Sequence, residues 1–156
     1  MLMFACLVPA RVCAIEVVTN LQVPEVSLTQ SQLRRIYTMR QLRWSDDSVI
    51  TVFVLPTQNK LHHRFSKERL QIFPYQLNRI WHKLTYSGLG VAPITVESEQ
   101  ELIQAVINTP GAIGYIQDET LIQMKITENN STQDPDMKDA QLVSVKGVVN
   151  VVKIND

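Results

Sequence analysis

The polar segment Thr57-Gln58-Asn59-Lys60 has the side-chain types that bind anions. It directly precedes a predicted helix, and the first N–H groups of a helix lack intrahelical partners and carry partial positive charge. Hydroxyl, amide and ammonium groups beside such N–H groups can donate hydrogen bonds to phosphate or sulfate. The segment therefore predicts an oxyanion site, although ordinary helix capping uses the same residue types.

A second segment that could contact a ligand is Ser87-Gly88-Leu89-Gly90. Glycine has no Cβ, so the backbone can approach a bound molecule closely. We expect Ser87 and Gly88 to face the first segment and to contribute to the same site. The alternative is an ordinary turn after a helix.

The chain lacks the residue groupings that most catalytic sites need. His62 and His63 are adjacent, so a helix directs them to different faces and they cannot bind one metal ion together. Glu97, Glu99 and Glu101 straddle a predicted helix start, where the helix dipole favours acidic side chains. The sequence contains no Gly-x-Ser-x-Gly, Walker or dinucleotide motif. We therefore expect no catalytic residues, no metal site and no cofactor.

Strands and helices alternate along the chain and must position these segments. Two pairs, Thr29 with Gln32 and Ser98 with Glu101, fit capping boxes at helix starts. The continuous run Val49–Leu55 is typical of a strand buried on both faces in a sheet covered by helices. The predicted strands are 15–18, 49–55, 113–116 and 147–154. The predicted helices begin near 30, 61, 74 and 99. The helix from 61 is predicted to end near 71, and the helix from 99 to end at 108. These elements indicate an α/β fold, with an acidic loop predicted at 128–139.

The chain has 156 residues, which suits one domain with one core, and its formal net charge is zero. The charge is distributed unevenly, because residues 27–85 contain ten Lys/Arg and three Asp/Glu, whereas residues 86–156 contain four Lys and ten Asp/Glu. A basic half can attract anions, nucleic acid or an acidic membrane surface. The alternative is that the two halves neutralise each other within the fold.

The N-terminal residues resemble part of a signal peptide. Met1–Pro9 is apolar apart from Cys6, and Val12-Cys13-Ala14 places small residues before a cut at Ile15. No Lys or Arg precedes the apolar run, so we expect residues 1–14 to be the end of a leader that starts upstream, with a single domain at 15–156. The alternative is a buried first strand. Both cysteines would leave with the leader, so we expect no disulfide and no thiol chemistry.

The run Pro110-Gly111-Ala112-Ile113-Gly114-Tyr115 follows a predicted helix and reads as a turn and a buried strand. Together with the preceding order of elements from Leu28, it resembles the phosphate-binding proteins of ABC transporters, specifically one of their two lobes. The resemblance extends to about Gln117. It implies a three-layer lobe of the type II periplasmic binding protein kind, with a mixed sheet covered by helices. It also implies export to the periplasm, a non-enzymatic role, an oxyanion ligand such as phosphate, and a membrane transporter or envelope protein as partner.

The same resemblance implies that the anion grip is weakened. In the family, an Arg on the strand and Ser-Gly-Thr at the helix start hold the anion, and the corresponding positions here are Leu55 and Asn59-Lys60-Leu61. A buried phosphate needs several donors to offset its desolvation. We therefore expect weak binding. The alternative is an interaction module that has lost its ligand and docks a protein partner, and an exported protein is not expected to bind nucleic acid. The basic residues expected at that docking face are Arg34, Arg35, Arg64, Lys67 and Arg69.

Overall fold

The structure is a computed structural model that describes residues 14–120 and 149–155. The described strands are β1 (Ile15–Asn20), β2 (Ser27–Thr29), β3 (Thr51–Val54), β4 (Ile94–Thr95), β5 (Ala112–Gln117) and β6 (Val149–Asn155). The described helices are α1 (Gln30–Tyr37), α2 (Lys60–Glu68), α3 (Pro74–Tyr86) and α4 (Glu99–Asn108). The predicted leader apart from Ala14, both cysteines and the predicted acidic loop at 128–139 lie outside the described residues.

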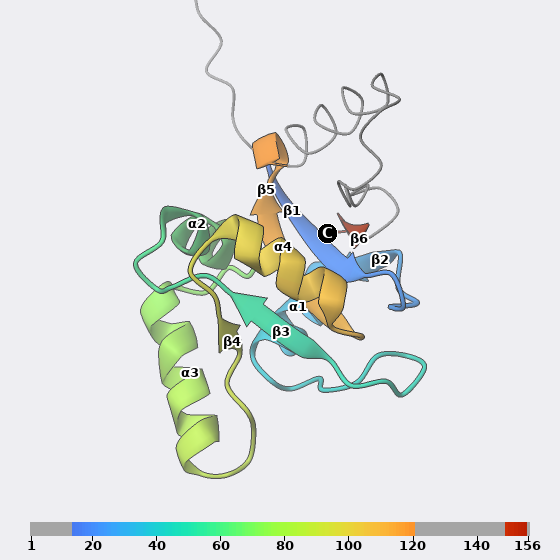
Figure 1. Cartoon of the computed structure of the whole chain (residues 1–156). Coiled ribbons are helices and arrows are strands. Elements are labelled where there is room, and N and C mark those ends of the chain that lie inside the picture. The colour runs from blue at the N-terminus through green and yellow to red at the C-terminus, as the bar shows by residue number, and fades with distance from the viewer. Residues whose placement is uncertain (1–13, 121–148, 156) are drawn as a thin grey trace, which may run out of the picture.

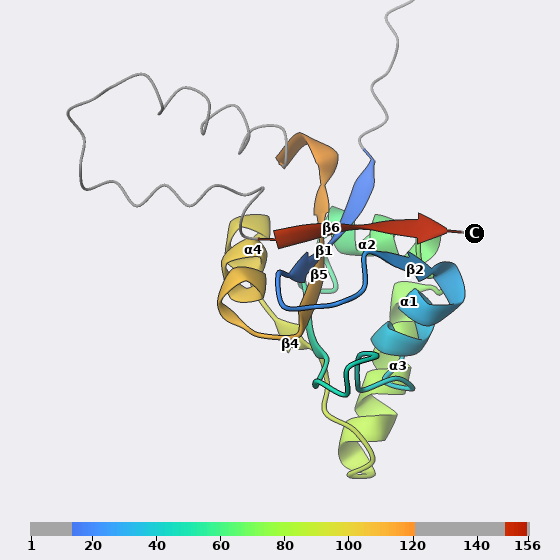
Figure 2. The ribbon, with the colours of Figure 1, turned by 90° about the vertical axis from the view of Figure 1, so that its right-hand side faces the viewer.

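The six strands form one mixed sheet in the order β2-β6-β1-β5-β3-β4. Strand β1 runs antiparallel to both of its neighbours, β5 and β6, whereas the other strand pairs of the sheet are parallel. Helix α4 lies on one side of the strands, and α1, α2 and α3 lie on the other (Figures 1 and 2). The predicted α/β fold with a mixed sheet covered by helices is therefore confirmed.

Local sequence signals account for two of the helix starts. At α1 the Thr29 hydroxyl accepts from the Gln32 N–H at 3.2 Å, and the Gln32 side chain accepts from the Thr29 N–H at 2.8 Å, so the capping box is complete. At α4 the Ser98 hydroxyl accepts from the Glu101 N–H at 3.2 Å. The Glu101 carboxylate, however, accepts from the N–H of Glu97 instead of Ser98. The second capping box therefore has the bond to the Ser98 hydroxyl but lacks the bond from the Ser98 N–H to the Glu101 side chain.

Several predicted elements differ from the structure. Strand β3 is shorter than the predicted 49–55, because Val49 pairs with Arg43 in an isolated bridge and is 58% exposed. Helix α2 ends at Glu68 and not near 71, and Gln71 adopts a positive φ of 54° that no helix contains. The edge strands β2 and β4 were not predicted, since two- and three-residue strands carry no periodic signal.

The glycines of the Pro110–Tyr115 run allow close packing around β5. Gly111 has a φ of +71°, and a Cβ there would collide with the carbonyl oxygen of Val49. The same glycine accepts a hydrogen bond from the indole N–H of Trp44 at 2.9 Å. A Cβ at Gly114 would meet the side chain of Leu102, so α4 packs directly on the backbone of β5. These contacts confirm that the run is a buried central strand.

Candidate functional site

The first turn of α2 presents hydrogen-bond donors without acidic neighbours. The Asn59 side-chain oxygen accepts from the Leu61 N–H at 2.8 Å, and the Asn59 carbonyl accepts from the His63 N–H at 3.1 Å. Among the described residues, the backbone N–H groups of Lys60 and His62 have no hydrogen-bond partner. The first turn contains no Asp or Glu. Two N–H groups at the positive end of the helix dipole therefore lack an acceptor; Lys60 is exposed, whereas His62 is 1% exposed.

The residues before α2 add side-chain donors to this turn. The Thr57 hydroxyl accepts from the Asn78 side-chain amide at 3.0 Å, which leaves its own hydrogen available to donate. The Asn59 side-chain amide can also donate, because its oxygen is the atom that caps the helix. Gln58 and Lys60 are exposed, and Thr57 and Asn59 are half-buried. The predicted segment 57–60 is thus a donor-rich surface turn that opens to solvent.

The other predicted part of the site lies elsewhere. Ser87 ends α3, where its N–H donates to the Lys83 carbonyl and its hydroxyl donates to the Leu84 carbonyl. Gly88 follows with a φ of +69° and is exposed. Figures 1 and 2 both place this loop at the opposite end of α3 from α2. Nine residues separate Ser87 from Asn78, which is about 13 Å along a helix. Ser87 and Gly88 therefore do not face Thr57 in this chain.

A buried polar contact holds the start of α2 against the sheet. His62 Nδ1 lies 2.7 Å from the Tyr115 hydroxyl, which accepts a second bond from the Leu55 N–H at 3.0 Å. The Tyr115 ring stacks on Phe65 at 3.9 Å between centroids. Burial, the larger cause, and the nearby positive charge of His63 together lower the pKa of His62 to about 4. His62 is therefore neutral at pH 7, and Lys60 supplies the charge of this turn.

These two residues were not singled out as a pair by the sequence. His62 and Tyr115 are 53 positions apart, and neither belongs to a motif that predicts their contact. Leu55, the position where the resembling family carries Arg, is 1% exposed and belongs to the core. The turn after β3 is consequently held by core packing and a neutral hydrogen bond, and the strand supplies no cation to an anion.

The arginines predicted as a docking face bond mainly to their own chain. The Arg34 Nε donates to the Leu70 carbonyl at 2.8 Å, and the Arg69 guanidinium donates to the Ile15 carbonyl at 2.7 Å. The other members of the set bond or pack as follows: Arg35 to Gln41, Arg64 to Glu68, and Lys67 over the Phe73 ring. Arg34 and Arg69 therefore join α1, α2 and β1, which limits the charge they offer to a partner.

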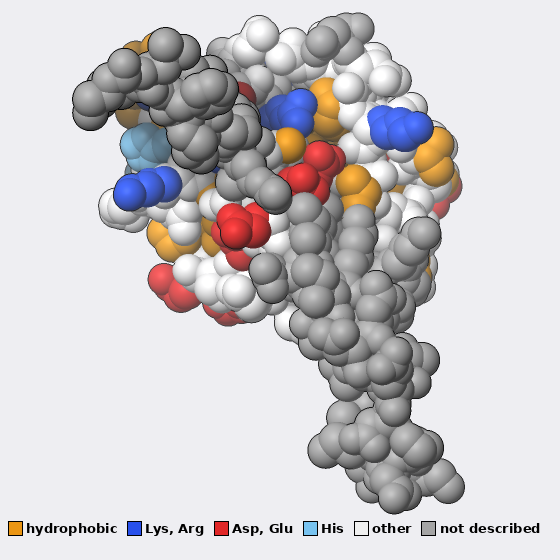
Figure 3. Space-filling view, turned by 90° about the horizontal axis from the view of Figure 1, so that it is seen from above, with side chains coloured by type: hydrophobic (Ala, Val, Ile, Leu, Met, Phe, Trp, Pro, Cys, Tyr) orange, Lys and Arg blue, Asp and Glu red, His pale blue; other side chains and the backbone are white. Residues whose placement is uncertain are grey.

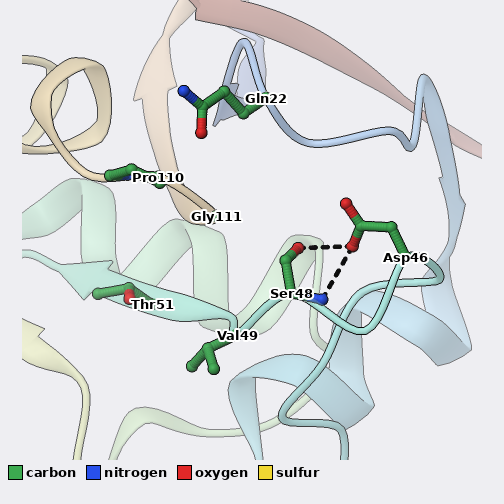
Figure 4. Close-up of a pocket in the computed structure, with 7 residues that line it drawn as sticks. All are labelled: Gln22, Asp46, Ser48, Val49, Thr51, Pro110 and Gly111. Atoms are coloured by element: carbon green, nitrogen blue, oxygen red, sulfur yellow. Dashed lines mark hydrogen bonds between the residues drawn. The ribbon is translucent and has the colours of Figure 1, made fainter.

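A shallow pocket of about 280 Å³ lies at the other end of the sheet (Figure 4). It is lined by Gln22, Asp46, Ser48, Val49, Thr51, Pro110 and Gly111. It adjoins the starts of the parallel strands β3 and β5, whereas the segment 57–60 follows the end of β3. The Ser48 hydroxyl and N–H donate to the Asp46 carboxylate at 2.6 and 3.0 Å and lower its pKa. A carboxylate repels phosphate, so this pocket is a poorer anion site than the α2 turn.

The face seen from above in Figure 1 carries mixed charges. Figure 3 shows Lys/Arg, His and Asp/Glu side chains close to one another on it.

Within residues 14–120 and 149–155, no group of three or more His, Cys, Asp or Glu could hold a metal ion. In the same part of the chain, no helix is both long and apolar enough to span a bilayer.

Comparison with known proteins finds no matching family model and no matching curated protein. Solved structures do match. PstS from Borrelia burgdorferi superposes with a TM-score of 0.59 at 18% identity, covering 92% of this chain and 48% of that one. An ABC-type phosphate transport receptor from Vibrio cholerae gives 0.57 at 16% identity, covering 91% and 46%. A protein from Clostridium perfringens, described as a phosphate ABC transporter substrate-binding protein with bound phosphate, gives 0.55 at 18%, covering 91% and 45%.

These matches establish the fold. The chain spans about half the length of the structures it matches, and it has the fold of one lobe of phosphate-binding proteins. The predicted likeness to a single lobe is therefore confirmed.

Proposed function

We propose that this chain is a non-enzymatic, solute-binding-like protein that binds phosphate or a similar oxyanion weakly at the start of α2. The observation that carries this proposal is the donor set at that turn: the unpartnered N–H groups of Lys60 and His62, the Lys60 ammonium, and the side chains of Thr57 and Asn59. Such donors suit an oxyanion. The fold, which is that of one lobe of phosphate-binding proteins, supports the choice of phosphate.

The geometry favours weak binding. Gln58 and Lys60 are exposed, so water competes for the ligand and screens the charge. The buried Leu55 offers no cation, and Ser87 and Gly88 lie at the C-terminal end of α3. A half-open set of donors in water gives a dissociation constant on the order of millimolar, which corresponds to about −4 kcal/mol.

Titration with phosphate tests the proposal. Isothermal titration measures the affinity, and amide NMR shifts should change first at Lys60 and His62. Lys60→Gln should weaken phosphate binding about fivefold because one nearby charge is removed. Lys67→Gln, on the same helix but in its last turn, is the matched control and should bind like the wild type. Absence of heat and of amide shifts at millimolar phosphate or sulfate, with the protein folded, would rule the site out.

We also propose that the protein is exported and works with an envelope partner. The apolar run Met1–Pro9 and the small residues before Ile15 support cleavage there. Expression from the natural start codon followed by N-terminal sequencing should give a mature protein beginning at Ile15. Recovery of uncleaved protein from the cytosol alone would contradict export.

The alternative is an interaction module that has lost its ligand and docks a protein partner or an envelope complex. The buried Leu55, which offers no cation, and the position of Ser87 at the other end of α3 from Asn78 favour it. This alternative would be supported if the protein co-purifies with envelope proteins and does not bind phosphate. The bonded arginines Arg34 and Arg69 make their charge-reversed variants a poor probe, since the bonds they lose are structural.

A further inference from the structure

The end of α3 and the loop after it form an exposed apolar tip. Tyr86, Leu89 and Val91 are 88%, 76% and 82% exposed. Single exposed apolar side chains are common, but three within six residues on one projecting loop form a cluster that solvent disfavours. Figures 1 and 2 show this loop at the bottom of the molecule, away from the sheet.

Positive charge accompanies this apolar tip. Arg79 and Lys83 are exposed and lie one helical turn apart, and Tyr86 continues the same side of α3. None of the described residues forms an ion pair with Arg79, His82 or Lys83. No Asp or Glu occurs from residue 69 to residue 96. The tip therefore combines a convex apolar surface with a cationic flank that no acidic side chain among residues 14–120 and 149–155 neutralises.

The tip is separate from the proposed anion site. Strands β3 and β4 are parallel, so the loop before β4 and the turn after β3 lie at opposite ends of the sheet. The apolar residues Leu89 and Val91 therefore lie far from the anion site, whereas Arg79 adjoins Asn78, which bonds to Thr57. A ligand of the tip need not affect phosphate binding at α2.

We propose that this tip, formed by Arg79, Lys83, Tyr86, Leu89 and Val91, docks on an anionic phospholipid surface. A bilayer interface accepts aliphatic side chains, retains Tyr at the headgroup level and attracts Lys and Arg. Aliphatic side chains contribute little to binding nucleic acid, which relies on cations and aromatic stacking. Protein interfaces favour Trp, Tyr and Arg at their centres over Leu and Val. A convex aliphatic tip with cations behind it fits a lipid surface best.

Vesicle co-sedimentation tests the proposal. The wild-type chain should bind vesicles of phosphatidylcholine mixed with phosphatidylglycerol more tightly than vesicles of phosphatidylcholine alone, and salt should weaken the binding. Leu89→Ser with Val91→Ser should weaken it roughly tenfold. Val26→Ser is the matched control, because Val26 is 75% exposed in a different part of the chain. Lys83→Gln should weaken binding about fivefold, and Lys153→Gln, on β6, should not.

A second variant reports insertion directly. In Leu89→Trp the added indole should show a blue-shifted emission with anionic vesicles and quenching by brominated lipid. Competition with inorganic phosphate at fixed ionic strength distinguishes binding to lipid headgroups from binding to free phosphate. Free phosphate should not displace the protein from vesicles. Lys60→Gln should bind vesicles like the wild type, so failure of the anion site leaves this test intact.

Several outcomes would overturn the lipid proposal. One is equal vesicle binding by the Leu89/Val91 variant and the Val26 control. Another is displacement of the protein from vesicles by free phosphate. Tip variants that lose a protein partner or an oligonucleotide, while the wild type ignores vesicles, would assign the tip to that other partner. Circular dichroism of each variant confirms that the exposed substitutions leave the fold intact.

Discussion

The Tyr115 hydroxyl lies 2.7 Å from His62 Nδ1 and accepts the backbone N–H of Leu55, so one phenol connects three segments. It joins strand β5, the end of β3 and the first turn of α2. The buried Tyr115 side chain therefore contacts the residues on both sides of the turn that offers donors to an anion. The contact links the core to both ends of the segment that contains residues 57–60.

Removing that phenol oxygen should destabilise the protein. Tyr115→Phe leaves the Leu55 N–H and His62 Nδ1 without their partner in a buried environment, at a cost of about 1–3 kcal/mol. Urea denaturation measures the free energy of unfolding. Tyr75→Phe, at a side chain that is 62% exposed, is the control and should change it little. Equal stability of the two variants would show that the buried hydroxyl contributes nothing.

Stability should fall as the pH falls from 7 to 5. The pKa of His62 is about 4 in the folded protein and 6.5 in the unfolded chain. Between pH 7 and 5 the unfolded chain therefore binds a proton at His62, whereas the folded protein does not. The stabilisation is complete above pH 6.5 and decreases towards pH 4, by about 2 kcal/mol between pH 7 and 5. Denaturation at several pH values gives the slope, and NMR of the His62 ring gives its titration.

His63 provides the comparison for this pH dependence. It neighbours His62 and is exposed. Because burial is the larger cause of the lowered His62 pKa, His63→Gln should retain most of the slope, whereas His62→Gln should lose most of it. A His62 ring that titrates near 6.5 in the folded protein would contradict the expected desolvation.

Gly111 should tolerate no side chain. Gly111→Ala adds a Cβ that collides with the Val49 carbonyl at a backbone φ of +71°, so we expect a loss of more than about 2 kcal/mol. Gly88→Ala separates the two causes, because Gly88 has a φ of +69° but open space around a Cβ. It should cost only about 1 kcal/mol from backbone strain. Thermal denaturation measures both, and similar losses would mean that the collision is relieved.

Arg69 should act as a structural residue. Its guanidinium donates to the Ile15 carbonyl at 2.7 Å and joins the end of α2 to β1. Arg69→Gln should lower the free energy of unfolding by about 1–2 kcal/mol, because a part-buried charged hydrogen bond is lost. Lys67→Gln removes the same charge from a side chain that packs on an exposed ring, and it should cost less. Chemical denaturation distinguishes them, and equal losses would argue that Arg69 serves only as surface charge.

Features that depend on neighbouring residues could be predicted from the sequence. The Thr29–Gln32 box involves groups three positions apart, and α4 was predicted with its observed bounds because its cap, apolar spacing and following Pro110 and Gly111 agree. The strand after Gly111 was predicted correctly for a similar reason. The segment Thr57–Lys60 was also recognisable, since a capping residue before a helix is a local pattern.

Other features depend on segments that are far apart in the chain. Ser27 pairs with Lys153 in β2 and β6, and Phe53 pairs with Ile94 in β3 and β4, so the edge strands exist only because the sheet supplies a partner. The bonding of Arg34 and Arg69 likewise required the folded positions of Leu70 and Ile15. Long-range contacts of this kind leave no periodicity in the sequence.

By itself, the sequence determined the α/β class, the starts of the main helices, the buried strand that follows Gly111 and the donor chemistry of the turn before α2. Short-range spacing encodes each of these features. Only the tertiary structure decided that His62 is buried against Tyr115, that Ser87 and Gly88 lie at the far end of α3, and that the tip at Leu89 and Val91 is exposed. The physical reason is that burial and proximity are properties of the packed sheet and helices as a whole.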